Sequence, residues 1–167
     1  YGTVVAILAV QDGWGQTDKG WVSMAYVEPA EDVQEAVTDN GLAIIQDLIP
    51  QGRANRPGGS NPDTYITIHE TGNYAKGANA AAHASWLKSD DAASKKISYH
   101  YTVDDHSIYQ HLPDDERAYH AGDGGNGPGN ATSIGIEICV NSDGDFAQAK
   151  DNAAALVRLL MQRHGIP

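Results

Sequence analysis

The chain has 167 residues, and its 22 acidic side chains outnumber its 11 Lys and Arg side chains, which gives a formal net charge of −11 at pH 7. This charge argues against nucleic acid as a partner, because phosphate binding needs a basic face, and against an electrostatic hold on anionic lipid. The hydrophobic content of 41% suffices for a packed core, and no apolar run reaches the roughly 18 residues of a membrane-spanning helix. A disulfide within the chain is excluded, because Cys139 is the only cysteine.

The pattern of residues 1–27 is typical of a small β-sheet unit. Residues 3–10 are apolar and rich in β-branched side chains, and Gln11-Asp12-Gly13 follow as a turn signal. Residues 14–17 and 20–27 predict further strands beyond that turn.

Two tryptophans in this segment each stand beside a glycine-bearing turn. The motifs Gly13-Trp14, Gly20-Trp21-Val22 and Tyr26-Val27 resemble the last strands of a bacterial SH3 domain, and the resemblance implies a cell-wall-binding module. Trp14 and Trp21 are equally well interpreted as core residues. An SH3 domain is a small β-barrel, and a fragment of it would expose unpaired strand edges. We therefore do not expect residues 1–27 to fold alone.

The rest of the chain divides into an acidic linker and a larger domain. Residues 28–38 are acidic and low in large apolar groups, which predicts a linker with at most a transient helical turn. Residues 39–167 alternate strand and helix patterns, which predicts an α/β domain with a central mixed β-sheet flanked by helices. The chain begins without Met and stops directly after a helical pattern, so we expect a fragment of a longer protein, truncated at the C-terminus of this domain.

Strand and helix patterns follow each other along the larger domain. Strands are predicted from apolar, β-branched runs, and helices from alanine-rich or amphipathic spacing. A hairpin is predicted across Asp104-Asp105. The predicted strands are residues 64–69, 98–103, 107–112 and 133–140, the predicted helices are 77–89 and 149–164, and a glycine-rich loop covers 121–130.

Two residues in predicted strands carry the clearest chemical signals. His69 ends an apolar strand, which is a rigid place from which to present an imidazole, although a lone histidine is more often a hydrogen-bonded structural residue. Glu137 lies within the run Ile134–Val140, and strand alternation places it on the face opposite Ile136 and Ile138. A carboxylate in an apolar strand is costly unless it is paired or functional, and partial burial would raise its pKa toward the range useful for proton transfer. We therefore favour a functional role for Glu137 over a place on a solvated sheet face.

The remaining histidines give weaker signals. Tyr99 and His100 are neighbours on a predicted strand and point to opposite faces, so only one of them can face a cleft. His120 directly precedes the glycine-rich loop, whose backbone donors could line a substrate groove. No HExxH or CxxC pair is present, so the sequence holds no complete motif of these kinds for zinc. Surface or packing positions are predicted for His83, His106, His111 and His164.

Several motifs, in one order along the chain, resemble the type-2 amidase family of N-acetylmuramoyl-L-alanine amidases, which bacterial autolysins, phage endolysins and peptidoglycan recognition proteins share. The resemblance covers nearly all of residues 39–167 and is closest to the endolysin and autolysin branch. The matching motifs are Tyr65-Ile66-Thr67-Ile68-His69-Glu70-Thr71, residues 98–105, residues 108–113, Ala118-Tyr119-His120-Ala121-Gly122-Asp123, and Asn130 with residues 133–139.

The resemblance implies a zinc hydrolase that cleaves the amide between N-acetylmuramic acid and the L-alanine of the stem peptide. His69 matches the first zinc ligand, and Glu137 matches the catalytic glutamate, a general base for the attacking water. Tyr99, or its neighbour His100, matches a position where some members have a catalytic tyrosine. The substrate groove is implied for Thr71, His100, His120 and Asn130.

The chain departs from the family pattern at its C-terminal end. The family takes its second and third zinc ligands, a His and then a Cys or Asp, from a segment after the last helix, whereas this chain ends at Pro167. A catalytic zinc normally has three protein ligands, so we expect an active parent protein and a chain that by itself binds zinc poorly and is inactive. Two alternatives are a peptidoglycan-binding module without catalysis and an unrelated metal-free α/β domain.

The implied partner is bacterial peptidoglycan, bound by a monomer. Because peptidoglycan lies outside the cytoplasmic membrane, we expect a protein that is secreted or associated with the cell wall, or one that a phage encodes and releases to the wall at lysis.

Overall fold

The computed structural model describes residues 7–17, 19–27 and 36–167. The chain forms two compact units, residues 1–34 and 35–167. Most of the predicted linker, and with it the predicted helical turn, lies outside the described residues, as does the first part of the strand predicted at residues 3–10.

The first unit contains a three-stranded antiparallel sheet of β1 (Ala9–Gln11), β2 (Trp14–Thr17) and β3 (Gly20–Ser23). The strand predicted at residues 20–27 ends at Ser23, because Met24–Tyr26 form a 3₁₀ turn that closes with the Val27 N–H donating to the Met24 carbonyl (3.3 Å). This part of the prediction was therefore wrong.

The two tryptophans of this unit lie on one face of its sheet. Trp21 stands opposite Gln16 across the β2–β3 pair, and Trp14 stands opposite Ser23, so strand alternation places both indoles on the same side. Each tryptophan is 50% exposed. The described residues therefore do not bury Trp14 and Trp21 as core residues.

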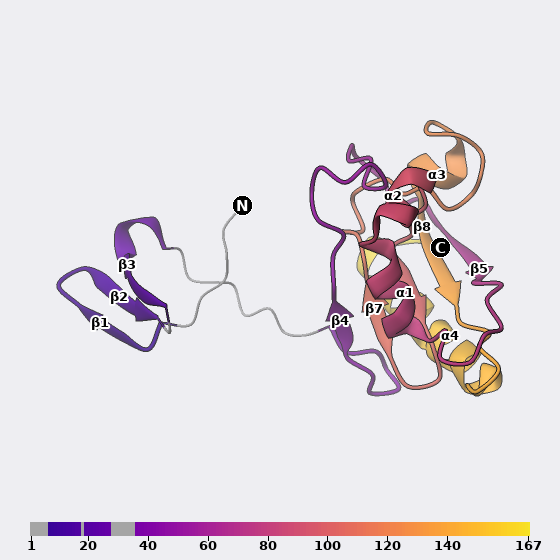
Figure 1. The fold of residues 1–167 in the computed structure, drawn as a ribbon, viewed down its shortest axis with the longest axis horizontal. Coiled ribbons are helices and arrows are strands. Elements are labelled where there is room, and N and C mark those ends of the chain that lie inside the picture. The colour runs from indigo at the N-terminus through magenta and orange to yellow at the C-terminus, as the bar shows by residue number, and fades with distance from the viewer. Residues whose placement is uncertain (1–6, 18, 28–35) are drawn as a thin grey trace. The chain divides into compact units, whose positions relative to one another are not determined.

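The second unit is built on a five-stranded mixed sheet with the strand order β4-β7-β6-β8-β5 (Figure 1). The β6–β7 pair is antiparallel, as the predicted hairpin requires, and the other pairs are parallel. This confirms the central mixed sheet flanked by helices. The strands are β4 (Ile44–Gln46), β5 (Tyr65–Glu70), β6 (Tyr101–Val103), β7 (Ile108–Gln110) and β8 (Ser133–Ile138).

Helices cover both faces of this sheet. The long helix α4 (Phe146–His164) packs Ala153, Leu156 and Leu160 against the isoleucines of β8 in the larger core cluster. On the other face, Leu87 and Trp86 of α1 (Ala80–Leu87) pack with Tyr99 and Leu112 in a second cluster. The short helices α2 (Asp90–Lys95) and α3 (Pro128–Thr132) follow α1 and precede β8. None of the helices in the described ranges is both long and apolar enough to cross a membrane.

The predicted elements differ from the observed ones mainly at their ends. Helix α2 was not predicted, although Ser89 caps it by accepting from the Ala92 N–H (3.2 Å) and two aspartates occupy its first turn. Of the strand predicted at 98–103, only β6 is regular. The backbone N–H of Ser98 donates to the Tyr119 carbonyl, whereas that of His100 donates to the Gly135 carbonyl, so the two residues bond to different segments. Strand β4 was missed, and α3 ends the loop predicted at 121–130.

The C-terminal end of α4 contacts a partly buried cluster of ionisable groups. His164 lies 3.3 Å from an Asp63 oxygen through Nδ1 and 2.9 Å from an Asp114 oxygen through Nε2. Burial, together with the nearby Asp114, raises the pKa of the Asp63 carboxyl to about 6, and the attraction of His164 only partly opposes this. Asp63 also has a positive φ of 51°, a conformation that Asn tolerates as well as Asp.

Asp63→Asn should therefore stabilise the protein at high pH and not at low pH. The folded-state pKa of Asp63 is raised, so the folded state is favoured while the carboxyl is protonated, below about pH 4, and loses this advantage as pH rises through about 6. After allowance for solvent screening and for the lost His164 contact, the substitution should raise the free energy of unfolding at pH 8 by about 1 kcal/mol. Urea unfolding of both proteins at pH 4 and pH 8 measures it, and an equal effect at the two pH values would contradict the assignment.

Candidate active site

A row of polar side chains crosses the sheet on the face opposite α4. In the parallel ladders, His69 of β5 pairs with Glu137 of β8, and Glu137 pairs with Thr102 of β6. Paired residues project to the same face of a sheet, and the flanking Ile136 and Ile138 belong to the core against α4. The three polar side chains therefore lie side by side on the α1 face.

Glu137 lies where two cavities meet. The first cavity has a volume of about 400 Å³ and the second about 580 Å³, and Glu137 and Tyr99 line both. The Glu137 Oε2 atom is buried without a hydrogen-bond partner among the described residues. Burial raises the pKa of the Glu137 carboxyl to about 7. Such a carboxyl can accept and return a proton near neutral pH.

The first cavity combines apolar walls with polar atoms that have no partner. Trp86 and Ile97 line it, together with Thr71 and His83. The His83 Nδ1 lies 3.0 Å from the Tyr99 hydroxyl. The Thr71 Oγ1 and His83 Nε2 atoms are buried with no hydrogen-bond partner among the described residues. Both atoms are therefore available to hydrogen-bond a group bound in this cavity.

Two histidines adjoin the second cavity. His120 lines it, and the His120 Nδ1 lies 3.0 Å from the His69 Nε2, with the two rings in an edge-to-face arrangement. Burial lowers the pKa of His69, and burial together with the neighbouring His100 and His69 lowers the pKa of His120 to about 4. Both imidazoles are therefore neutral at pH 7, which is the form that binds metals.

The residues around His69 fit part of a zinc site. His69 offers an imidazole nitrogen on a rigid strand end, but the described residues place no set of three His, Cys, Asp or Glu ligand atoms around it. The one such group in the described ranges is Asp104, Asp105 and His106. There, an Asp104 oxygen accepts from the backbone N–H groups of His106 and Ser107, which is a turn contact, and no predicted site residue takes part.

Two residues predicted to bind substrate have structural hydrogen-bond partners, although one of them, Asn130, also lines the second cavity. His100 is fully buried, its Nδ1 accepts from the Gly135 N–H (2.9 Å), and its Nε2 therefore carries the proton and donates to the Glu116 carbonyl (2.8 Å). No ring nitrogen of His100 is left for a substrate, which corrects that expectation. Asn130 is 3% exposed and accepts from the backbone N–H groups of His120 and Ala121 (2.8 Å each), so it shapes the loop that lines the second cavity.

Sequence reasoning missed residues of both cavities. His83 was predicted as a surface or packing residue, yet it lines the first cavity. Its signal was the spacing of three positions to Trp86, which places both side chains on one face of α1. Lys95 and Lys96, at the end of α2, line the second cavity, and without α2 nothing in the sequence placed them there.

Comparisons with known proteins cover most of the second unit. A family model described as N-acetylmuramoyl-L-alanine amidase (Amidase_2) matches residues 59–167. Two curated proteins of Bacillus subtilis (strain 168) are similar: the N-acetylmuramoyl-L-alanine amidase XlyA is 58% identical over 123 residues, and the N-acetylmuramoyl-L-alanine amidase CwlH is 52% identical over 126 residues. These matches cover 74% and 75% of this chain but only 40% and 49% of XlyA and CwlH, so the chain spans less than half of either relative.

Solved structures share the fold. The catalytic domain of XlyA superposes with a TM-score of 0.71 at 56% identity, over 75% of this chain and 80% of that domain. A structure of PlyL superposes with a TM-score of 0.65 at 32% identity, over 75% of this chain and 77% of that chain.

Proposed function

The chain belongs to the Amidase_2 family of N-acetylmuramoyl-L-alanine amidases, and we propose that it hydrolyses the amide bond between N-acetylmuramic acid and the L-alanine of the peptidoglycan stem peptide. The observation that carries this proposal is Glu137, a half-buried carboxyl at the junction of two cavities and beside His69, whose Oε2 atom has no hydrogen-bond partner in the described part of the chain. A bond that joins two bulky groups would lie at such a junction, with one group in each cavity.

In this proposal Glu137 moves the proton. It takes a proton from the attacking water as the new C–O bond forms on the lactyl carbonyl, and it delivers that proton to the nitrogen of L-alanine as the C–N bond breaks. The products are a lactyl carboxylate and a free α-amine. Burial raises the pKa of Tyr99, so its hydroxyl stays protonated beside Glu137. In the tautomer in which the His83 Nδ1–H donates to the Tyr99 oxygen, that hydroxyl can donate to the carbonyl oxygen, where negative charge develops.

We further propose that His69 is the zinc ligand that this chain supplies. When bound, zinc would activate the attacking water and polarise the carbonyl. The described residues place no set of three His, Cys, Asp or Glu ligand atoms around His69, so the proposal assigns one zinc ligand only. Thr71 and His120 would contact the substrate, since each lines a cavity.

A peptidoglycan-binding module without catalysis is the weaker reading. Binding alone gives no reason for a carboxyl whose pKa is raised to about 7 between two cavities. The wall would be the site of action in either case, for a monomer that is secreted or released to it. For residues 1–27, we propose the end of an SH3-like wall-binding module, supported by the exposed Trp14 and Trp21.

The reaction can be identified by the groups that it releases from purified peptidoglycan. The protein with its natural termini should liberate L-alanine α-amino groups and no new reducing sugar ends. A chelator should abolish the release, and added zinc should restore it. Chemical labelling of the new amines followed by mass spectrometry identifies the terminal residue. New reducing ends, or amines on a residue other than L-alanine, would exclude the proposed bond, and binding to the wall without release would favour the module without catalysis.

A further inference from the structure

Two of the chain's 11 Lys and Arg side chains line the second cavity. The chain has a net charge of −11, yet two lysines, Lys95 and Lys96, line this cavity, and Glu137 is its one acidic lining residue. The first cavity, by contrast, has no lysine or arginine in its lining. An anionic group would therefore be favoured in the second cavity and an uncharged group in the first.

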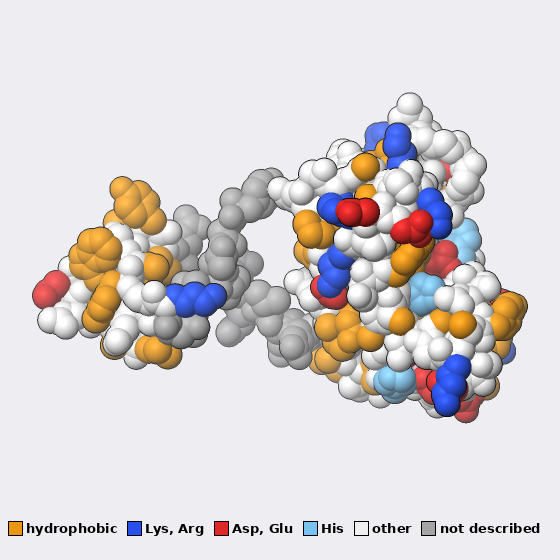
Figure 2. All heavy atoms as spheres, in the orientation of Figure 1, with side chains coloured by type: hydrophobic (Ala, Val, Ile, Leu, Met, Phe, Trp, Pro, Cys, Tyr) orange, Lys and Arg blue, Asp and Glu red, His pale blue; other side chains and the backbone are white. Residues whose placement is uncertain are grey.

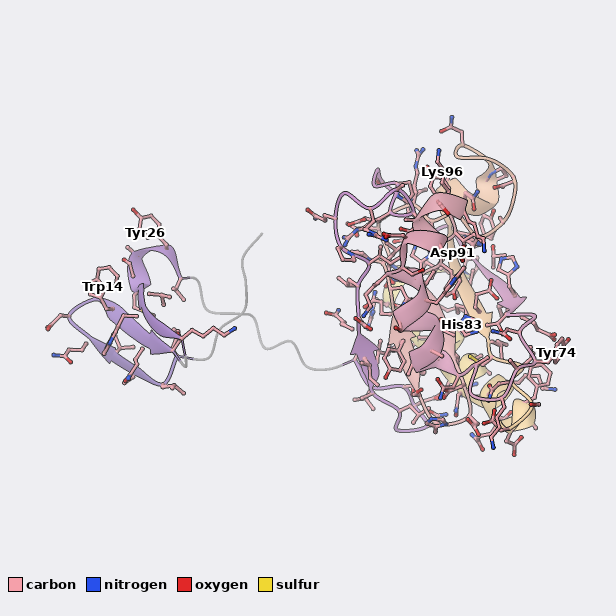
Figure 3. The ribbon with its side chains drawn as sticks, in the orientation of Figure 1. Trp14, Tyr26, Tyr74, His83, Asp91 and Lys96 are labelled. Atoms are coloured by element: carbon pink, nitrogen blue, oxygen red, sulfur yellow. The ribbon has the colours of Figure 1, made fainter. Side chains whose placement is uncertain are left out.

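Of the two lysines, Lys96 has the free charge. The Lys95 ammonium lies 2.8 Å from an Asp91 oxygen, and nearby Lys88 and Arg53 also have aspartate partners. Lys96 forms no ion pair with any residue that the structure describes. Figure 2 shows blue basic side chains beside red acidic ones over α1 and α2, and Figure 3 places Lys96 at the α2 end and His83 on α1.

The backbone of Lys96 is unusual for a lysine. It caps α2 in the left-handed conformation (φ 50°, ψ 53°), where its N–H donates to the carbonyls of Ala92 and Ala93. Glycine is the usual residue at such a cap because it has no Cβ atom to crowd the backbone, and asparagine is the next most tolerated. A strained position that holds a free cation at the mouth of a cavity points to a role in binding.

We infer that the second cavity binds the peptide side of the substrate, and that Lys96 pairs with a carboxylate on the residue that follows L-alanine. This inference rests on the proposed function and deepens it. The uncharged acetamido sugar would then occupy the first cavity, against Trp86, with the scissile amide beside Glu137. The predicted specificity is a preference for a free carboxylate over a carboxamide at that residue.

The preference can be measured as binding, separately from cleavage. The probes are N-acetylmuramoyl-L-alanyl-D-glutamate and the corresponding D-isoglutamine compound, each with its γ-carboxyl blocked as an N-methylamide, so that one has a free α-carboxylate and the other has none. Calorimetry on the protein with its natural termini and the substitution Glu137→Gln, which prevents turnover, should show about three- to five-fold tighter binding of the carboxylate, the range of an exposed ion pair. Adding Lys96→Asn, which suits the left-handed backbone, should bring this ratio close to one. Adding salt should reduce the ratio as well.

The matched control is Lys150→Gln, which removes a lysine on α4 that lines neither cavity and should leave the ratio unchanged. A ratio that Lys96→Asn does not alter, a preference for the carboxamide, or no binding of either probe would overturn the inference. Release of L-alanine amines by the unsubstituted protein in the same preparation would show that the proposed function stands even then. If the unsubstituted protein releases no L-alanine amines but the affinity ratio of the two probes is as expected, the proposed reaction is wrong and the proposed binding site stands.

Discussion

Replacing Glu137 by Gln should lower the rate of L-alanine amine release from peptidoglycan by about 10²- to 10⁴-fold, the usual contribution of a positioned general base. Gln keeps the size and shape of the side chain but cannot take a proton from water. The variant should fold normally. Burial raises the pKa of Glu137 to about 7, so the folded state loses stability as pH rises from the unfolded-state pKa of about 4.3 through about 7, and Gln removes the full cost at pH 8.

The expected result is thus a loss of activity without a loss of stability. Rates of amine release and urea unfolding midpoints at pH 8 measure the two effects on one preparation. Glu70→Gln is the matched control, because Glu70 is an exposed carboxylate on β5 next to His69 and lines neither cavity. If Glu137→Gln retains more than about a tenth of the activity, another group takes the proton and the assignment is wrong.

Local sequence patterns were sufficient to predict the position of Glu137. Alternation along β8 predicted that Glu137 faces away from Ile136 and Ile138, and these isoleucines do form the core against α4. The same pattern could not show that Glu137 is beside His69, because that depends on the pairing of strands more than sixty residues apart. Before the structure, only the resemblance to a family indicated that His69 and Glu137 belong to one site.

The expected role of His100 was wrong for a similar reason. A strand pattern predicts on which face of the sheet a side chain lies, but it does not predict which other residues pack against that side chain. His100 is enclosed by Gly135 and Glu116, which come from distant segments and occupy both ring nitrogens. Strand β4 was missed because it has only three residues, and its parallel partner β7 lies far along the chain. Helix α2 had a local signal in its Ser89 cap, and reading it would have indicated Lys96 as well.

Gly135 has a different role, which no local pattern could predict. A Cβ atom at this position would come within 2.7 Å of the Cγ and Cδ2 atoms of His120, a distance that real contacts do not allow. His120 cannot move away freely, because its Nδ1 lies 3.0 Å from the His69 Nε2. Gly135→Ala should therefore push the His120 ring off His69, destabilise the protein by about 1–3 kcal/mol as overpacked cores do, and lower the activity.

A double-mutant cycle separates this contact from a general effect of alanine in β8. In a His120→Ala background the ring is gone, so Gly135→Ala should cost nothing or stabilise the strand slightly, since alanine loses less backbone entropy than glycine. The coupling between the two sites should then be about 2 kcal/mol, measured by urea unfolding of the four proteins. Gly125→Ala is the control for the same cavity, because its nearest contact would be an ordinary 3.8 Å to Tyr119. Additive effects of Gly135→Ala and His120→Ala would show that Gly135 does not hold the His120 ring against His69.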